Sequence, residues 1–412
     1  MRRPRSARQP GGPRGLLAAA LLVALGTLAP TWPDAAAAAQ PGIPALAPGA
    51  SQVAAIPEVS AAGAVLWDPA DDRVLYGKQE AAGRPMASTT KIMTALLALE
   101  AGVVDEEIMV SSTAAALGEI GGAANLGLVA GQRVPARSLL TGLIVRSGND
   151  AAVAVAEHVA GSEAAFVEKM NARAAELGLE STGFVNASGL TDDLSHQASP
   201  LDLARLAQVA MSHPDFAAWA ATTFLDVPGL PRNPSRNELL TIYPGATGVK
   251  TGYTDLAGLC LVASATRDGR TLFAVVLGSQ DSFADAIALL NHGFDDFRRP
   301  APLGTGDAAA VYRWAGVEVA ALAAETLTAT APVTARVTWR AVLDAGAQPP
   351  VEASAPLGTG QLLIDGEVVR ETQLHAATAV APVPRTGDGA VGAALQDAVR
   401  AFSRLHVVER AA

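Results

Sequence analysis

The sequence contains one cysteine and few histidines, which excludes a disulfide scaffold and a zinc site. Cys260 has no partner within the chain, so no intramolecular disulfide can form. The six histidines include no pair with the spacing of metal ligands. We therefore expect no metal and no cofactor. Half of the 412 residues are apolar, which is enough for a sizeable core and for more than one domain.

Positive charge is also in short supply. Thirty basic side chains face forty acidic ones, and the formal net charge is -10 at pH 7. A protein that binds duplex nucleic acid needs a broad basic surface to neutralise phosphates. We therefore expect no nucleic-acid partner.

Among the basic residues, lysine is rare. Only four of the thirty are lysines, namely Lys78, Lys91, Lys169 and Lys250. A solvated positive charge can be either residue, whereas only lysine offers a compact ammonium or an amine that can lose its proton. Each lysine is therefore a candidate for a specific chemical role.

The N-terminal segment has the pattern of a secretory signal peptide. The first fourteen residues carry five arginines and no acid, and an apolar run over 15–29 leads to small residues at 35–39. The alternative, a retained transmembrane anchor, needs about 20 apolar residues, and Pro30 ends this run early. We expect cleavage after residue 39 and export to the cell wall or the outer face of the cytoplasmic membrane.

After a linker over 40–55, residues 56–297 have the pattern of an α+β domain. A hairpin is expected over 63–79, and a second one turns at Asp268-Gly269 between strands 257–266 and 270–278. Apolar periodicity and capping residues predict helices between the hairpins. These helices cover 88–100, 136–145, 150–160, 163–177 and 200–211. Helices combined with antiparallel strands indicate the α+β class.

Beyond residue 297 the helical periodicity stops, and residues 300–381 predict a small all-β, sandwich-like domain. Strands are expected at 317–320, 326–330 and 333–340, with a hairpin at Asp365-Gly366.

A Pro/Gly linker over 382–392 then leads to a short amphipathic helix over 393–405. This helix could lie on a membrane surface, or it could pack on its own domain.

Three short motifs carry reactive or substrate-binding side chains. The first is Ser88-Thr-Thr-Lys91 at the start of a helix, where positions i and i+3 lie on one face. A serine becomes a nucleophile when a neighbour takes its proton, and a lysine whose pKa burial has lowered can do so. Taken alone, the pattern also fits a capping serine and a solvated lysine.

The second motif, Ser147-Gly148-Asn149, lies in a break between two helices, where Asn149 could simply be a helix cap. The third, Lys250-Thr251-Gly252, opens an expected strand. Lysine and threonine there can bind a carboxylate, and glycine allows another backbone to approach closely. Each of these tripeptides could occur by chance.

Together, in this order, the three motifs resemble the signature of the serine penicillin-recognising enzymes. Ser-Gly-Asn combined with Lys-Thr-Gly-Tyr-Thr and a trailing β domain resembles the low-molecular-mass D-alanyl-D-alanine carboxypeptidases, the penicillin-binding protein 5/6 type of peptidase family S11. The resemblance implies a β-lactamase/transpeptidase-like catalytic domain, peptidoglycan stem peptides as substrates and β-lactam antibiotics as covalent inhibitors.

The resemblance also implies a role for each site residue. Ser88 would be the acyl-ester nucleophile, Lys91 its base, and Ser147 the relay of a proton to the leaving amine. Substrate contacts would come from Asn149, Lys250, Thr251 and Gly252, and from Tyr253, whose backbone N–H would complete an oxyanion hole with that of Ser88. No histidine lies near these motifs in the sequence, although one could fold in.

Two alternatives stay open. A class A β-lactamase would need a deacylating glutamate, for which the nearest candidate is Glu176 in the segment 176–180. A non-catalytic penicillin-binding sensor or wall scaffold would not need the intact nucleophile and base that this chain keeps.

Overall fold

The computed structural model describes residues 56–118, 122–314, 317–382 and 408–411. Buried apolar side chains form three clusters, of which two lie within residues 59–290 and one within 303–380. The boundary expected near residue 300 falls between them. We call 56–297 the first domain and 300–381 the second domain.

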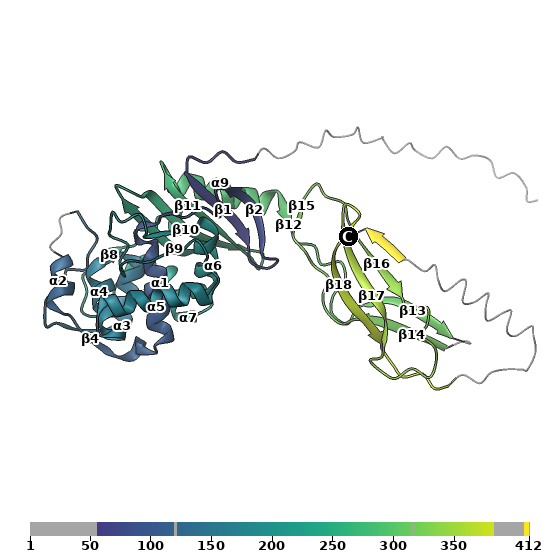
Figure 1. The fold of residues 1–412 in the computed structure, drawn as a ribbon. Helices are drawn as coiled ribbons and strands as arrows, with labels where there is room; N and C mark the ends of the chain where they lie inside the picture. The colour runs from purple at the N-terminus through teal and green to yellow at the C-terminus, as the bar shows by residue number, and fades with distance from the viewer. Residues whose placement is uncertain (1–55, 119–121, 315–316, 383–407, 412) are drawn as a thin grey trace, which may run out of the picture. The chain divides into compact units, whose positions relative to one another are not determined.

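The centre of the first domain is a five-stranded antiparallel sheet in the order β2-β1-β11-β10-β9 (Figure 1). Its strands are β1 (Gly63–Asp68), β2 (Arg73–Lys78), β9 (Ala246–Thr254), β10 (Gly258–Arg267) and β11 (Arg270–Ser279). Both predicted hairpins are present. In the second hairpin the turn residues Asp268 and Gly269 have φ of 50° and 76°, the backbone that an Asp-Gly turn favours.

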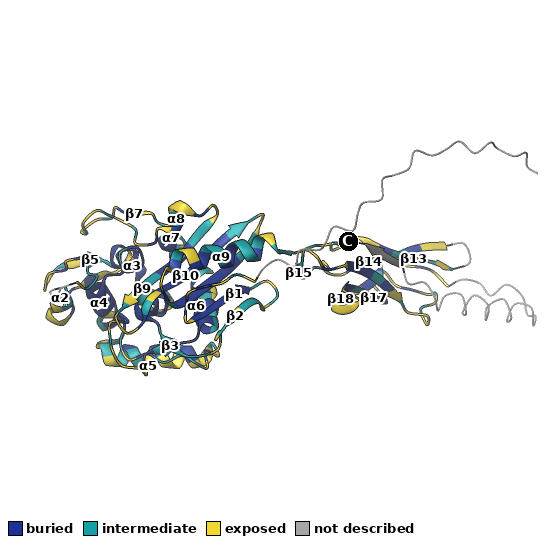
Figure 2. Cartoon of the chain, turned by 90° about the horizontal axis from the view of Figure 1, so that it is seen from above, coloured by how far each residue is buried: buried dark blue, intermediate teal, exposed yellow. Residues whose placement is uncertain are grey.

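Both faces of this sheet are buried (Figure 2). Along β11, Phe273, Val275 and Leu277 belong to one apolar cluster, and the alternate residues Leu272 and Ala274 belong to another. Because side chains alternate across a strand, each cluster lies on one face. Helix α9 covers one face, and α6 packs on the other.

The helices of the first domain largely follow the predicted ones. They are η1 (Ala87–Thr90), α1 (Lys91–Glu100), η2 (Val103–Asp105), α2 (Ser112–Leu117), α3 (Ala136–Val145), α4 (Asn149–Ala160), α5 (Glu163–Glu176), α6 (Pro200–Met211), α7 (Pro214–Ala220), α8 (Leu239–Ile242) and α9 (Ser282–Asp295). Capping explains several starts. The Ser199 hydroxyl, for example, accepts the Asp202 backbone N–H at 3.1 Å and begins α6.

Some of these helices were not expected from the sequence. The N-cap signal of α9 was available, since Asp281 accepts the Ala284 N–H at 3.0 Å. By contrast, α2 and α7 span only six and seven residues, which is too short for a clear helical periodicity. The predicted helix at 88–100 also begins differently, because its first turn is the 3-10 helix η1.

Three short strand pairs connect loops within the first domain, and a fourth pairs the end of the first domain with the second domain. They are β3 (Arg84–Pro85) with β6 (Gln197–Ala198), β4 (Glu107–Met109) with β5 (Arg133–Pro135), β7 (Phe224–Leu225) with β8 (Asn233–Pro234), and β12 (Phe297–Arg298) with β15 (Ala331–Pro332).

The second domain is all-β, as predicted, and contains a six-stranded antiparallel sheet in the order β13-β14-β18-β17-β16-β19. The strands are β13 (Ala308–Trp314), β14 (Val317–Ala323), β16 (Val337–Leu343), β17 (Pro356–Ile364), β18 (Glu367–Ala376) and β19 (Val408–Ala411). The hairpin at Asp365-Gly366 joins β17 to β18 as expected.

Two strand predictions for the second domain were wrong. Residues 326–330 form no strand and make only an isolated bridge between Leu327 and Leu303. The strand expected at 333–340 begins at Val337, because Ala331 and Pro332 pair with β12 and residues 333–336 turn. In both places, contacts distant in the sequence overrode the alternating pattern.

Several predicted segments lie outside the described residues: the signal peptide at 1–39, the linker at 40–55, almost all of the linker at 382–392, and the helix at 393–405. Among the helices that the structure describes, none combines the length and apolar character needed to span a bilayer.

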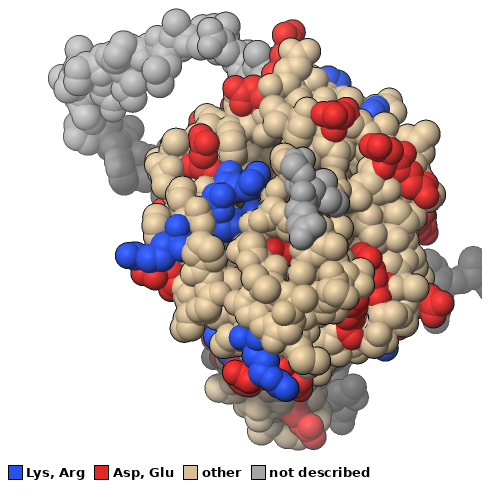
Figure 3. Space-filling model, turned by 90° about the vertical axis from the view of Figure 1, so that its left-hand side faces the viewer, with Lys and Arg blue, Asp and Glu red and all other residues tan. Residues whose placement is uncertain are grey.

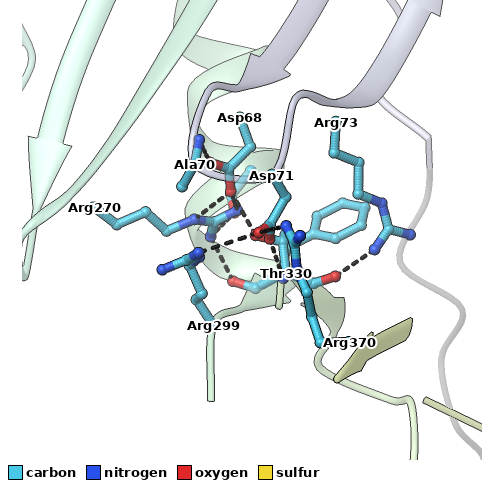
Figure 4. A network of polar contacts seen from close by, with 10 residues as sticks. Asp68, Ala70, Asp71, Arg73, Arg270, Arg299, Thr330 and Arg370 are labelled. Carbon is cyan, nitrogen blue, oxygen red and sulfur yellow. Dashed lines mark hydrogen bonds and ion pairs between the residues drawn. The ribbon is translucent and has the colours of Figure 1, made fainter. Parts of the chain in front are cut away.

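Two aspartates at the β1–β2 turn join the domains through hydrogen bonds (Figure 4). Asp68 has no exposed surface. One of its oxygens accepts two hydrogen bonds from the Arg270 guanidinium, at 3.0 and 2.9 Å, and one from the Thr330 hydroxyl at 2.6 Å. The carboxylate is thus fully paired, which is the condition under which a buried charge is tolerated.

Asp71 accepts hydrogen bonds from Arg299 at 3.1 Å, from Arg370 at 3.0 Å and from the Thr330 N–H at 2.5 Å (Figure 4). Burial alone would raise the pKa of Asp71, but the bonds from Arg299, Thr330 and Arg370 outweigh it and lower the pKa to about 2. A carboxyl group whose pKa falls on folding stabilises the folded state while it is ionised.

Asp71→Asn should therefore destabilise the folded protein by about 1 to 3 kcal/mol at pH 7, because three donors lose a charged acceptor. The difference from wild type should hold down to about pH 4 and shrink as pH falls towards 2, where the wild-type carboxyl is protonated too. Melting temperatures of wild type and Asp71→Asn between pH 7 and pH 2 measure this difference in stability. The exposed pair Asp226–Arg232, 2.8 Å apart, provides the control, since Asp226→Asn should have little effect. A pH-independent difference for Asp71→Asn would contradict this account.

Candidate active site

Ser88 and Lys91 lie together where η1 passes into α1. Residues three apart are eclipsed in a 3-10 helix, and the Lys91 Nζ donates a hydrogen bond to the Ser88 Oγ at 2.8 Å. Ser88 keeps partial exposure, whereas Lys91 has none. The lysine is therefore a buried amine bonded to a serine hydroxyl that solvent can reach.

The Lys91 Nζ makes two further hydrogen bonds, to the Asn149 Oδ1 at 2.8 Å and to the Ser188 backbone oxygen at 2.5 Å. Burial, and to a lesser degree the positive charge of Lys250, lowers the pKa of Lys91 well below its usual 10.5. A lowered pKa increases the fraction of lysine that is neutral, and a neutral amine can accept a proton from a serine hydroxyl.

The second motif forms a tight turn between α3 and α4. Ser147 is buried and has a φ of 67°, a left-handed conformation uncommon for a residue with a side chain. Within the described residues, no hydrogen bond joins the Ser147 hydroxyl to Ser88 or Lys91. Asn149 begins α4 and is bonded to Lys91. The structure thus brings Asn149 into direct contact with the first motif and Ser147 into the adjoining turn.

Asp150 fastens this turn to the preceding loop. Its fully buried carboxylate accepts the backbone N–H groups of Leu126 at 2.8 Å and Leu128 at 3.1 Å. The Leu126 side chain fills the space beside Gly148, where an added Cβ would lie 2.6 Å from its Cγ. Burial lowers the pKa of Lys91, and the negative charge of Asp150 partly opposes this effect by raising it.

The third motif lies in the middle of β9, which begins at Ala246 rather than at Lys250 as expected. Lys250 is 1% exposed, and its Nζ donates to the Thr251 backbone oxygen at 2.9 Å. Burial, followed by the charge of Arg236, lowers the pKa of Lys250 to about 7. Tyr253, two residues beyond Thr251, is exposed.

Gly252 brings β9 against Ser88. A Cβ at this position would lie 3.0 Å from the Ser88 backbone nitrogen and 3.2 Å from the Ala87 Cβ. The strand therefore approaches the Ser88 N–H more closely than a side chain would permit. All three motifs thus meet around Ser88.

Some groups that contact the three motifs lie outside them and could not be predicted from the motif sequences. The Ser188 carbonyl is a backbone group, although Asn186-Ala-Ser-Gly189 is a typical turn sequence. Arg236 and His196 are distant in the sequence from the motifs they approach. Cys260 is buried, and burial raises the pKa of its thiol to about 11, which fits the expected apolar role.

Two cavities lie away from this arrangement. One of about 280 Å³ is lined by residues that include Trp67 and Arg205, and one of about 450 Å³ is lined by residues that include Trp219 and Phe224. No residue of the three motifs lines either cavity. We assign the site to the motifs because, among the residues that the structure describes, only there does a fully buried amine bond a serine hydroxyl.

Charges on the face shown in Figure 3 are mixed. Acidic side chains are scattered across it, and lysine and arginine occur in small groups between neutral surfaces.

A family model described as D-alanyl-D-alanine carboxypeptidase matches residues 50–281. The chain belongs to this carboxypeptidase family. It is 36% identical over 252 residues to D-alanyl-D-alanine carboxypeptidase DacF of Bacillus subtilis, covering 58% of this chain and 63% of that protein. It is also 36% identical over 250 residues to DacB2 of Mycobacterium tuberculosis, covering 58% of this chain and 84% of that protein.

Among solved structures, penicillin binding protein 5 from Haemophilus influenzae matches with a TM-score of 0.63 and 28% identity. That match covers 79% of this chain and 98% of the Haemophilus chain, so it extends beyond the family-model region. The predicted fold class is therefore confirmed for this carboxypeptidase family member, including its C-terminal β-sheet domain. The match to DacF, in contrast, spans less than two thirds of that relative's length.

Proposed function

We propose that this chain is a serine-type D-alanyl-D-alanine carboxypeptidase that removes the terminal D-alanine from peptidoglycan stem peptides. The observation that supports this most directly is the 2.8 Å hydrogen bond between the Lys91 Nζ and the Ser88 Oγ in a member of this family. Burial of Lys91 makes the bond chemically useful, because a depressed pKa lets the amine act as a base.

The reaction then proceeds through an acyl-enzyme. Neutral Lys91 takes the Ser88 hydroxyl proton as the oxygen attacks the carbonyl carbon of the penultimate D-alanine. The backbone N–H groups of Ser88 and Tyr253 stabilise the resulting oxyanion. The C–N bond breaks, Ser147 relays a proton to the departing amine, and water later hydrolyses the ester. The contact between Gly252 and the Ser88 nitrogen supports this placement of the oxyanion hole.

Substrate binding falls to the other motif residues. Asn149, held by Lys91, orients the peptide, and Lys250 with Thr251 binds the terminal carboxylate. β-Lactam antibiotics would acylate the same serine and act as covalent inhibitors.

The rival readings have weaker support. Glu176, the candidate deacylating glutamate of a β-lactamase, has a side chain that is 64% exposed and paired with Arg173 at 2.9 Å. Among the described residues, no hydrogen bond or ion pair joins it to a proposed site residue. A non-catalytic sensor would have no need of a lysine buried against the nucleophile.

A fluorescent penicillin followed by a chase distinguishes these alternatives. We expect covalent labelling that is lost slowly. Rapid loss of the label would indicate a β-lactamase, and no labelling would indicate a scaffold. Release of one D-alanine from a diacyl-D-alanyl-D-alanine peptide completes the test.

We also propose that the protein works outside the cytoplasm, because residues 1–39 have the composition of a signal peptide. Residues 393–405 would add a peripheral membrane contact of modest affinity, since their apolar face is small. Fractionation of cells that express the full chain or a chain lacking only residues 393–405, which keeps β19, tests the contact. An unchanged membrane fraction would contradict it.

Ser88→Ala should abolish both peptide hydrolysis and penicillin labelling, because it removes the oxygen that forms the ester. Lys91→Arg should lower the acylation rate by a factor on the order of 100 to 10 000, since guanidinium stays protonated and general-base assistance is lost. Stopped-flow kinetics with a chromogenic β-lactam measure the acylation rate of both variants, and release of D-alanine measures peptide hydrolysis. Lys169→Arg, an exposed lysine of α5, is the matched control and should behave as wild type. A penicillin adduct in Ser88→Ala would remove this serine from its role.

The pKa of Lys250 predicts a pH dependence in substrate recognition. Lys250 carries its charge below about pH 7 and loses it above. For a peptide with a free C-terminal carboxylate, kcat/KM should therefore fall as pH rises through about 7, because this ratio reports ionisations of the free enzyme. The same peptide with a C-terminal amide should lack this descending limb. If kcat/KM fell equally for both peptides as pH rose through about 7, Lys250 would not be the group that provides positive charge for the carboxylate.

A further inference from the structure

A chain of hydrogen bonds, buried at His196 and Thr90, leads from a distant loop to the peptide bond before Ser88. The Val185 N–H donates to the His196 Nδ1 at 3.0 Å, and the His196 Nε2 bonds the Thr90 Oγ1 at 2.7 Å. The Thr90 hydroxyl donates to the Ala87 carbonyl oxygen at 2.7 Å. His196 is 2% exposed and Thr90 has no exposed surface. Water therefore does not compete for the two bonds that the Thr90 hydroxyl makes.

The direction of each proton in this chain is fixed. A backbone N–H can only donate, so the His196 Nδ1 accepts from Val185 and the ring proton must be on Nε2. Nε2 then donates to Thr90, which leaves the threonine proton for Ala87. Burial lowers the pKa of His196 to about 4, and this keeps the ring in the neutral form that the pattern requires.

The last hydrogen bond of the chain is accepted by the peptide group that also provides the Ser88 N–H. The carbonyl of Ala87 and the N–H of Ser88 belong to the same peptide bond. A hydrogen bond to a peptide carbonyl polarises the group and strengthens its N–H as a donor, so hydrogen bonds in a chain reinforce one another. The donor strengthened here is the Ser88 N–H, which lies beside Gly252.

Packing holds this peptide bond in an unusual orientation. Ala87 has a φ of 48° despite its side chain. Gly189 presses against its carbonyl, since a Cβ on Gly189 would lie 2.0 Å from the Ala87 oxygen. Among the described side chains, the Thr90 hydroxyl is the one that donates a hydrogen bond to this crowded Ala87 oxygen. Without it, a buried carbonyl would lose a partner and the peptide bond a restraint.

We propose that His196 and Thr90 are positioning residues of the oxyanion hole, acting through the Ala87–Ser88 peptide bond to orient and strengthen the Ser88 N–H. This inference rests on the proposed function, in which that N–H binds the oxyanion. Neither residue touches the substrate. Both act on the charge that develops in the transition state, which is where an oxyanion hole contributes most.

The carbonyl stretch of the acyl-enzyme reads out this role directly. A β-lactam labelled with ¹³C at the acylating carbonyl forms the ester on Ser88, and difference infrared spectroscopy of the full-length protein reports its band. A weaker Ser88 donor polarises the ester less, so Thr90→Val should move the band to higher wavenumber. Thr90→Ser, which keeps the hydroxyl, should retain the wild-type band.

Variants at His196 separate its two bonds. His196→Gln can place an amide donor near the Nε2 position and should retain much of the wild-type band. His196→Asn cannot reach Thr90 and should shift the band as Thr90→Val does. Acylation should slow by about 10-fold in Thr90→Val, less than the roughly 100-fold or greater loss that follows complete removal of an oxyanion donor. Adding His196→Asn to Thr90→Val should slow it little further, because the chain is already broken.

Thr94→Val is the matched control. Thr94 lies one turn further along α1, is equally buried, and donates to the Ala187 carbonyl at 2.6 Å. Its loss should lower stability as Thr90→Val does but leave the carbonyl band unmoved. A shift of equal size in Thr94→Val, or no shift in Thr90→Val, would overturn the proposal. If wild type forms no adduct at all, the proposed function itself fails, which is a different result from an adduct with an unshifted band.

Discussion

The burial of one amine, that of Lys91, is the constraint on which the rest of the site depends. A lysine with no exposed surface is tolerated only because three acceptors surround its Nζ: Ser88, Asn149 and the Ser188 carbonyl. Those acceptors come from three separate segments, so the bonds that satisfy the amine also assemble the site. The same burial lowers the pKa of Lys91, which the proposed role of this amine as a base requires.

Close backbone approach is the second requirement. Gly252 lets β9 reach the Ser88 nitrogen, and Gly189 lets the 186–189 turn reach the Ala87 carbonyl. The short turn that carries Ser88 is thus held between two glycines on different segments. Asp150 and Leu126 hold the Ser147 turn in a comparable way. The geometry of the site is therefore maintained by backbone contacts as well as by the motif side chains.

Much of this could be predicted from the sequence because the signals were local. Capping residues and periodicity indicated α3 and α6, and Asp-Gly pairs indicated two hairpins. The three motifs contain most of the reactive side chains. Other features depend on contacts between distant segments: Asp68 and Asp71 bind Thr330 where a strand was expected, and His196 reaches Thr90 over 106 residues. A single sequence does not indicate such pairings, and the Ser188 carbonyl has no side-chain signature at all.

The most direct test of the central claim is the titration of Lys91 in the folded protein. The chain has only four lysines, so a spectrum of protein labelled with ¹⁵N at the lysine Nζ contains few signals, and single Lys→Met variants assign them. The account predicts that Lys91 titrates well below the usual lysine value of 10.5 and that Lys250 titrates near 7. A pKa near 10.5 for Lys91 would mean that it is fully protonated at neutral pH, which would contradict its role as the base of Ser88.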